Sequence, residues 1–220
     1  DRPKSDELAP AGLRHVQLSI QDPDPVKADR IPAYPGAHLK KISIAREIRA
    51  AGLALTLNVV VHRLNLIRLE QIIDIALELN AERLEIAHAQ YHGWALLNRA
   101  ALMPARHQVQ QAMVAVAEAK QRLNGRIRID YVASDYHARR PKACMGGWGQ
   151  RFFVVAPDGA MLPCHAAPSI PGLAFPNVKT TALKAAWEDS AAFAAFRGTT
   201  WLAEPCRSCE LRDIDFGGCR

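Results

Sequence analysis

The chain has 220 residues, of which 49% are hydrophobic and 23% are charged, a balance that is typical of a folded protein and excludes a disordered one. The formal net charge is +6, with lysine and arginine spread along the chain, so the charge does not indicate a nucleic-acid partner. The longest apolar run, at residues 53–61, is far shorter than the ~20 residues of a membrane-spanning helix. No secretory signal opens the sequence, and we therefore expect a cytoplasmic protein without a membrane segment.

Short apolar segments alternate with amphipathic stretches over the first 125 residues. Strands are predicted at residues 16–20, 53–61 and 84–87, and a helix follows each of them because hydrophobic residues recur every three to four positions. The third helix opens at Pro104, and the helices end at Gly52, Asn80 and Asn124, residue types that are favoured just beyond a helix. The predicted buried faces are Leu39, Ile42, Ala45 and Ile48; Leu69, Ile72, Ile73, Ala76 and Leu77; and Val109, Ala112, Met113 and Val116. The pattern indicates an α/β fold with a parallel sheet.

Three parallel strands make an incomplete sheet, because both faces of such a sheet need covering and its edges need pairing or closure. The strand at residues 16–20 reads as an interior strand, although little chain precedes it. We predict that residues 1–125 are the rear part of a (β/α) barrel whose front strands are absent. The alternative is a small sandwich of a three-stranded sheet and its helices.

The composition changes after Gly125, where glycine, proline and cysteine become frequent. Residues 126–132 alternate like a strand, and residues 152–155, the turn at 157–159 and residues 161–162 predict a β-hairpin. Thr181 is predicted to cap a helix through Phe196, which buries Leu183, Ala186, Trp187 and Phe193. Residues 126–220 are therefore predicted to form a second, small α+β domain.

All five cysteines lie between positions 144 and 219. Because their number is odd and no export signal accompanies them, metal ligation explains them better than disulfide bonds. Two residues separate Cys206 from Cys209, so both thiolates can reach one metal centre from a tight turn. Zinc fits this pair as well as iron–sulfur does, but zinc ribbons usually carry two such pairs. Asp215, between Cys209 and Cys219, is either an oxygen ligand or an ordinary turn residue.

Glycines at positions 146, 147, 149, 217 and 218 stand beside these cysteines. A backbone that approaches a bulky inorganic cluster closely needs residues without side chains, so these glycines favour an iron–sulfur cluster. The alternative is that they are plain turn residues and that Cys144 and Cys164 are small core residues.

The segments that carry a family resemblance are PKACMGGWG at 141–149, VAPDG at 155–159, LPCHAA at 162–167, PCRSC at 205–209 and IDFGGCR at 214–220. They resemble the PqqE family of pyrroloquinoline quinone biosynthesis, whose members are radical S-adenosylmethionine enzymes with a C-terminal SPASM domain that binds two auxiliary iron–sulfur clusters. HVQLSIQD at 15–22 and QYHGWALLNRA at 90–100 are similar to the barrel segments of that family. The resemblance covers nearly the whole chain.

The resemblance implies a ligand set by position. Cys144, Cys164 and Cys219 correspond to ligands of the first auxiliary cluster, and the second is held by Cys206, Cys209 and Asp215. Both 4Fe-4S and 2Fe-2S clusters are expected in such a family. An aspartate in place of a cysteine is a physically sensible way to tune a cluster, because a harder oxygen ligand changes its electronic properties.

The resemblance also implies an activity. A reduced 4Fe-4S cluster cleaves S-adenosylmethionine to a 5′-deoxyadenosyl radical, which takes a hydrogen from the precursor peptide PqqA, and a carbon–carbon bond joins a glutamate and a tyrosine side chain of that peptide. A peptide chaperone, PqqD, and an electron donor such as flavodoxin are the implied partners. This sequence has no Cys-x3-Cys-x2-Cys motif for the first cluster and stops before the last auxiliary cysteines, so we expect the chain alone to be inactive.

Polar residues on the apolar strands are candidates for the barrel interior, where cofactor and substrate bind. We predict that Ser19, Gln21, Asn58 and His88 contact S-adenosylmethionine or peptide. The remaining candidates are His62, Glu85, Gln90, Tyr91, His92 and Trp94. Each is equally open to a purely structural role as a satisfied buried polar group.

Two other functions remain open from the residues alone. One is a zinc-binding interaction module, which the single close cysteine pair supports. The other is a different SPASM radical enzyme that acts on another peptide, as in sulfatase maturation or thioether formation.

Overall fold

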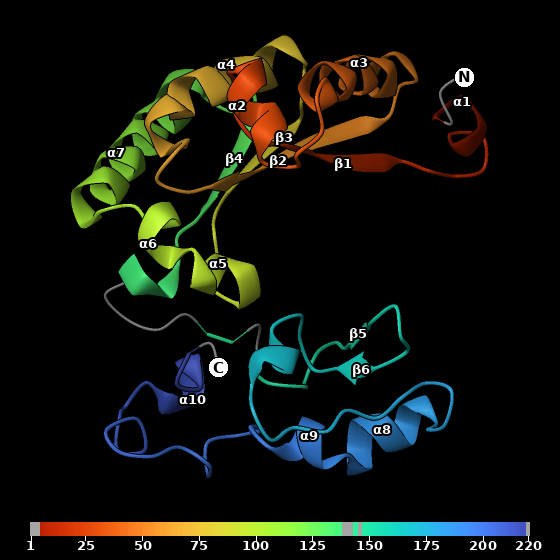
Figure 1. Ribbon diagram of the computed structural model, residues 1–220, viewed down its shortest axis with the longest axis vertical. Coiled ribbons are helices and arrows are strands. Elements are labelled where there is room, and N and C mark those ends of the chain that lie inside the picture. The colour runs from red at the N-terminus through yellow and green to blue at the C-terminus, as the bar shows by residue number, and fades with distance from the viewer. Residues whose placement is uncertain (1–4, 138–142, 145–146, 219–220) are drawn as a thin grey trace. The chain divides into compact units, whose positions relative to one another are not determined.

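The chain forms two compact units, Asp1–His137 and Ala138–Arg220, in a computed structural model that describes residues 5–137, 143–144 and 147–218 (Figure 1). Hydrophobic core residues lie within each unit.

The first unit contains a parallel sheet of four strands in the order β1-β2-β3-β4. The strands are β1 (His15–Ile20), β2 (Ala54–Val61), β3 (Arg83–His88) and β4 (Arg128–Val132). The helices are α1 (Ser5–Leu8), α2 (Pro25–Arg30), α3 (Ala37–Ala50), η1 (Leu66–Arg68), α4 (Leu69–Glu78), α5 (Gly93–Leu97), α6 (Arg99–Leu102), α7 (Arg106–Leu123) and η2 (Asp135–His137). The three predicted strands and the helices α3, α4 and α7 are confirmed. The shorter helices are missed because a few residues are too short to show a helical period.

The strand order and the position of the helices give this sheet the winding of a barrel. Successive strands are neighbours without any reversal of order, and α3, α4 and α7 all contribute to one core on one face of the sheet. In a doubly wound sheet the order reverses and helices cover both faces, whereas in a (β/α) barrel the helices form a single outer layer. The predicted fold class is therefore confirmed.

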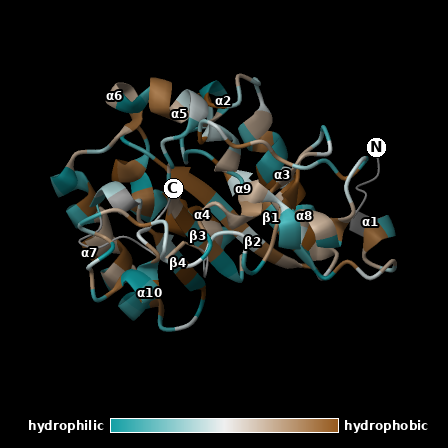
Figure 2. Cartoon of the chain, turned by 90° about the horizontal axis from the view of Figure 1, so that it is seen from below, coloured by the Kyte–Doolittle hydropathy of each residue, from teal (hydrophilic) through white to brown (hydrophobic). Residues whose placement is uncertain are grey.

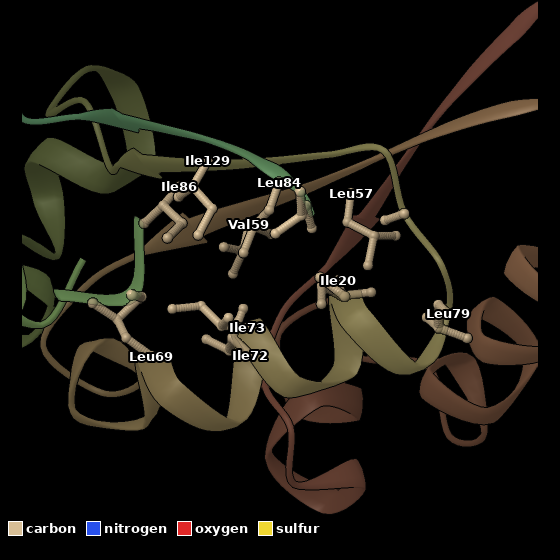
Figure 3. Packing of buried hydrophobic residues seen from close by; sticks show 14 of the residues in the cluster. Ile20, Leu57, Val59, Leu69, Ile72, Ile73, Leu79, Leu84, Ile86 and Ile129 are labelled. Atoms are coloured by element: carbon tan, nitrogen blue, oxygen red, sulfur yellow. The ribbon is translucent and has the colours of Figure 1, made fainter. Parts of the chain in front are cut away.

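The core of the first unit lies between the sheet and its helices (Figure 3). Leu57 and Val59 of β2 and Ile86 of β3 point toward Ile72 and Ile73 of α4, and none of the five side chains has any exposed surface. Burial of one side chain of this size contributes about 1.5–3 kcal/mol. The core thus fixes one face of the sheet and leaves the side chains between these positions on the other.

The predicted helix ends are confirmed. Gly52, Asn80 and Asn124 follow α3, α4 and α7, and their φ angles are +73°, +51° and +38°. A residue in the left-handed region commonly ends a helix, because it turns the chain and lets its N–H satisfy a free carbonyl of the last turn.

Two residues predicted on buried helix faces are instead exposed. Leu39 of α3 is 67% exposed and Met113 of α7 is 51% exposed. The apolar stripe of a helix is wide, and here the sheet covers only the positions near its centre, such as Ala45 and Val116.

Strand β4 belongs to the first unit, although the sequence assigns residues 126–220 to the second domain. It pairs in parallel with β3, where Leu84 is the partner of Ile129, and Ile127 and Ile129 join the first core. The chain therefore divides after His137 rather than after residue 125. Alternation predicts that a segment is a strand but does not identify the strand with which it pairs.

The second unit consists of short elements. They are β5 (Val154–Val155), β6 (Met161–Leu162), η3 (Ala167–Ser169), α8 (Leu183–Asp189), α9 (Ala191–Ala194) and α10 (Arg212–Asp215). The antiparallel pairing of β5 with β6 confirms the predicted hairpin. Two small clusters of buried residues support it: Trp148, Leu162 and Ala167, and Met161, Ala186 and Phe193.

The prediction of one helix from Thr181 through Phe196 is wrong. Ser190 has an extended backbone, with ψ 129°, and separates α8 from α9. Ala182 is the N-cap of α8, while the backbone N–H of Thr181 donates to Asn177 O at 2.9 Å within the preceding turn. Leu183, predicted on the buried face, is 54% exposed.

Hydrophilic residues colour much of α10 and part of α7 (Figure 2). None of the helices in the described ranges is both long enough and apolar enough to cross a membrane.

Candidate functional site

The four-stranded sheet has a polar face on the side opposite α3, α4 and α7. Strand side chains alternate between the two faces, so the residues between the core positions share this side. We call it the polar face; its hydrogen-bonding and charged members are His15, Gln17, Ser19, Thr56, Asn58, Arg83, Glu85, Arg128 and Asp130. Parallel sheets are normally covered by apolar layers on both sides, and a polar side is what the interior of a ligand-binding barrel presents.

Two predicted cofactor-binding residues are neighbours on the polar face. Ser19 of β1 and Asn58 of β2 are register partners, and Glu85 of β3 is the next partner in the same row. Ser19 is exposed, while Asn58 and Glu85 are partly buried. The row offers a hydroxyl, an amide and a carboxylate side by side, which can hydrogen-bond a ligand that carries both donors and acceptors.

An ion-pair ladder ends this row. The Asp130 carboxylate accepts Arg83 Nε at 2.5 Å and Arg128 Nε at 3.3 Å. Partial burial acts to raise the pKa of Asp130, but the hydrogen bonds and charges of the two arginines outweigh it and hold the pKa below its ordinary value. Asp130 therefore stays ionised, and its negative charge offsets part of the positive charge of the two arginines.

Gln21 lies just beyond β1, and its side chain is held from the helix layer. Its Oε1 accepts a hydrogen bond from Lys41 Nζ of α3 at 2.8 Å. Burial lowers the pKa of Lys41, and the negative charge of Asp29 opposes that shift. The amide nitrogen of Gln21 remains available at the carboxyl edge of the sheet.

Asn65 joins the carboxyl ends of β1 and β2. It is fully buried, and its Nδ2 donates to Gln21 O at 2.8 Å and to Val60 O at 3.0 Å, while its Oδ1 accepts the backbone N–H of His62 at 2.8 Å. Asn65 thus fixes the backbone at the carboxyl ends of both strands that carry the predicted cofactor residues. Nothing in the sequence around Asn65 indicates that it also bonds Gln21, which lies 44 positions earlier in the chain.

Asp22 and Arg68 form a buried ion pair next to Asn65. Arg68 Nε donates to Asp22 Oδ1 at 2.9 Å, Arg68 Nη2 donates to Asp22 Oδ2, and Asp22 is only 2% exposed. The hydrogen bonds to Asp22 raise the pKa of Arg68. This two-point contact holds the turn that carries Gln21 against the segment after β2.

His88, the fourth predicted cofactor residue, does not lie with the other three. It shares the face of Leu84 and Ile86, is 3% exposed, and its Nε2 lies 2.5 Å from the hydroxyl of Tyr131. Burial raises the pKa of Tyr131 to about 12, so the phenol stays protonated beside the His88 ring. Side chains of a strand alternate between its two faces, so His88 and Glu85, three positions apart, lie on opposite faces. The prediction did not use this signal.

Two polar atoms near this pair are buried without a hydrogen-bond partner, Ser134 Oγ and His137 Nε2. The rings of His137 and His88 have centroids 6.2 Å apart. Burial, and then the nearby charge of Arg106, lower the pKa of His137. His88, Tyr131 and His137 thus form a polar cluster near the carboxyl ends of β3 and β4.

The remaining candidates occupy different surroundings. His62 is buried, its Nδ1 accepts the backbone N–H of Leu64 at 3.2 Å, and burial lowers its pKa. Tyr91 is also buried, whereas Gln90 is exposed, His92 is partly exposed and Trp94 is 81% exposed.

In the second unit, the described cysteines Cys164, Cys206 and Cys209 are free thiols, and Cys144 is partly buried. Cys206 and Cys209 form a tight turn, in which the Cys209 N–H donates to Cys206 O at 3.3 Å. Cys209 is exposed and Cys206 is partly buried, so both sulfurs are accessible to a metal centre. Cys219 lies outside the described residues.

Asp215 is the least exposed acidic group of this region, at 9%. Its Oδ1 accepts the Gly217 N–H at 2.9 Å, and it ends the short helix α10. Phe216, Gly217 and Gly218 then all have positive φ, of +52°, +72° and +80°. This run of left-handed residues requires glycine at two of its three positions and turns the chain sharply after Asp215.

Not every glycine near the cysteines has the role that the sequence predicts. A Cβ at Gly149 would lie 3.1 Å from Phe193 Cδ1 and 3.3 Å from Phe193 O, so this glycine is required by packing against α9. A Cβ at Gly147 would meet the side chain of Gln150 at 2.5 Å.

The donor types fit an iron–sulfur centre: thiols that are not oxidised to disulfides, and one carboxylate with a single hydrogen bond from a backbone amide. Over residues 5–137, 143–144 and 147–218, no three His, Cys, Asp or Glu side chains come together in a group that could hold one metal ion. The grouping of the ligands into two sets therefore rests on the family resemblance.

Residues 144–210 match the model of the SPASM family, described as an iron–sulfur cluster-binding domain. The whole chain is 52% identical over 220 residues to a PqqA peptide cyclase of Bradyrhizobium diazoefficiens, and 54% identical over 217 residues, or 99% of the chain, to one of Methylobacterium sp. (strain 4-46). The chain spans 58% and 57% of the length of these two relatives.

Solved structures with a similar fold are much less similar in sequence. Streptococcus suis SuiB bound to S-adenosylmethionine matches 92% of this chain and 49% of its own with a TM-score of 0.71 and 16% identity. The enzyme anSMEcpe with bound AdoMet and a Kp18Cys peptide matches all of this chain and 63% of its own, with a TM-score of 0.68 and 15% identity.

Proposed function

We infer that the chain belongs to the PqqA peptide cyclases and acts within a radical S-adenosylmethionine enzyme that modifies a peptide. The observation that carries this inference is its similarity, above 50% identity along the whole chain, to several proteins of that name. The SPASM match at residues 144–210 supports it independently, because an iron–sulfur domain is part of such an enzyme.

The proposed reaction is the formation of a carbon–carbon bond between a glutamate and a tyrosine side chain of the peptide PqqA, with loss of two hydrogen atoms. When bound, S-adenosylmethionine and a reduced 4Fe-4S cluster supply the 5′-deoxyadenosyl radical that removes hydrogen from the peptide. The residues of this chain bind and orient the reactants, and shield them from water.

We propose that Ser19, Gln21 and Asn58 hydrogen-bond S-adenosylmethionine or the peptide from the polar face. Their register and their shared edge of the sheet support this proposal. An apolar row of Val60, Ala87 and Val132 lies next to them in register. Polar and apolar rows side by side suit a ligand that combines a charged amino-acid part with a nucleoside. His88 is better explained as a structural partner of Tyr131.

We propose the ligand sets as the resemblance gives them: Cys144, Cys164 and Cys219 for one auxiliary cluster, and Cys206, Cys209 and Asp215 for the other. The free thiols of Cys164, Cys206 and Cys209, the tight turn at Cys206 and the low exposure of Asp215 support them. A carboxylate ligand is expected to lower the affinity for iron relative to a thiolate, and to leave that position open to exchange.

PqqD as peptide chaperone and a flavodoxin-type electron donor are the proposed partners, and the cytoplasm is the proposed location. Reduced cysteines support that location, because a reducing compartment keeps cluster ligands out of disulfides.

The test uses the full-length enzyme, purified without oxygen, with PqqA, PqqD, S-adenosylmethionine and a reductant. We expect iron and sulfide in the protein, 5′-deoxyadenosine as a product, and a peptide lighter by about 2 Da whose fragments place the new bond between glutamate and tyrosine. If S-adenosylmethionine is cleaved but the mass of PqqA does not change, the enzyme acts on another substrate. A colourless protein with bound zinc and no iron would support an interaction module instead.

A further inference from the structure

The helices α5 and α6 form a surface with two features that the proposed chemistry does not use. Neither helix has a buried residue, and Trp94, Leu96 and Leu97 of α5 are 81%, 48% and 76% exposed. Trp94 and Leu97 are three positions apart, so they share one side of the helix. Exposed aromatic and aliphatic side chains in one place commonly mark a binding surface.

A groove adjoins these side chains. It has a volume of about 420 Å³ and is lined by Arg63, Leu96, Leu97, Arg99, Ala100, Met103 and Pro104. Arg63 builds it from the end of β2, because its Nε donates to Met103 O at 2.8 Å and its Nη1 to Ala100 O at 2.9 Å. The groove therefore has apolar walls and two guanidinium groups.

The positive charge of this groove is not compensated. Neither Arg63 nor Arg99 forms an ion pair with a carboxylate among the residues that the structure describes. The sequence has no aspartate or glutamate from residue 86 to residue 117, a stretch that contains both helices. Arg83 and Arg128 on the polar face are different in this respect, because Asp130 pairs with both.

We propose that the α5–α6 surface is the docking site for an acidic segment of the substrate peptide. Carboxylates of the peptide bind Arg63 and Arg99, and an apolar or aromatic side chain packs on Trp94 and Leu97. Because α5 follows the carboxyl end of β3, a peptide docked here lies at the edge of the sheet where barrel enzymes hold their ligands. The proposal rests on the proposed function, since it names a site for the same peptide.

The test measures the binding of fluorescently labelled PqqA to the full-length enzyme by anisotropy. The variants are Arg99→Glu and Trp94→Ala, whose side chains are exposed, and the control is Arg46→Glu, an exposed arginine on α3. We expect each of the first two to weaken binding about tenfold, and the control to bind like the parent enzyme. A PqqA version with every aspartate and glutamate replaced by its amide should bind the parent and Arg99→Glu equally.

Activity measurements distinguish a failure of this docking proposal from a failure of the proposed function. We expect Arg99→Glu to raise KM for the peptide about tenfold, with kcat within twofold and with unchanged cleavage of S-adenosylmethionine in the absence of peptide. Unaltered peptide affinity in both variants of an active enzyme would overturn the docking site alone. A change in the sedimenting mass of either variant, without a change in peptide affinity, would make the surface an interface between copies and would also overturn it.

Discussion

Asn65 shows how one buried side chain can set the geometry of a predicted cofactor site that it does not contact. Its amide bonds to two carbonyl groups and one N–H group at the ends of β1 and β2, and the side chain has no exposed surface. Water cannot replace these bonds without opening the edge of the sheet, so the three backbone groups depend on Asn65.

We predict that Asn65→Ala lowers the free energy of unfolding by about 3 kcal/mol, because it leaves buried backbone groups unpaired. Asn98→Ala is the matched control. Asn98 is exposed, and its Nδ2 donates to a single carbonyl, Trp94 O, at 2.9 Å, so we expect a loss below about 1 kcal/mol. Urea unfolding followed by circular dichroism gives both values. Equal losses in the two variants would contradict a special role for Asn65.

At this scale the sequence predicts residue types better than their surroundings. The polar character of Ser19 and Asn58 on apolar strands predicts both as candidates, and the structure makes them register partners. His88 falls on the opposite face, next to Tyr131, whose strand comes more than forty residues later. Contacts between distant segments, such as those of Asn65, leave no local pattern to read.

Trp148 and Gly149, which follow Cys144 in the sequence, pack against α9. Trp148 Nε1 donates to Ala192 O at 2.9 Å, and Gly149 O accepts Arg197 Nε at 3.1 Å and Arg197 Nη2 at 2.8 Å. Gly149 has a φ of +56° and lies directly against Phe193. Trp148 and Gly149 are therefore held by contacts with residues that lie more than forty positions later in the chain.

We predict that Gly149→Ala destabilises the second unit by about 3 kcal/mol, because a left-handed backbone costs ~1 kcal/mol and the added Cβ also crowds Phe193. Gly172→Ala separates the two effects. Gly172 has a φ of +79° and no atom within 4 Å of its ideal Cβ position, so only the backbone cost of ~1 kcal/mol remains. Thermal unfolding measures the difference, and two equal shifts would show that the contact with Phe193 relaxes freely.

Helices and strands with strong local sequence signals can be predicted from the sequence. The pairing of a short strand with its neighbour cannot. The ends of α3, α4 and α7 follow from Gly52, Asn80 and Asn124 because these residues act locally. β4 is recognisable as a strand, but its place beside β3 depends on Ile129 reaching the first core. The break at Ser190 is hidden because the alanines on both sides suit one continuous helix.

The two units differ in the size of the hydrophobic core and in the length of the helices that stabilise them. The first has one large core that runs from β1 to β4, whereas the second has two clusters of three buried residues each and no helix longer than α8 among its described residues. A unit of this size with so little core commonly depends on a bound metal for its stability.

We therefore predict that loss of a cluster loosens the second unit and leaves the first intact. In the full-length enzyme, Cys206→Ala combined with Cys209→Ala should speed amide hydrogen exchange at β6 and α8 about tenfold or more, because metal-binding free energy no longer stabilises their unit. Amides of β2 and α4 should exchange as before, since their core contains no residue of the second unit. Ser208→Ala, between the two cysteines, is the control: its hydroxyl bonds only Glu204 and Pro205 O within the same turn, so exchange should not change. Equally fast exchange in α4 and α8 of the double variant would mean that one cooperative unit spans the chain.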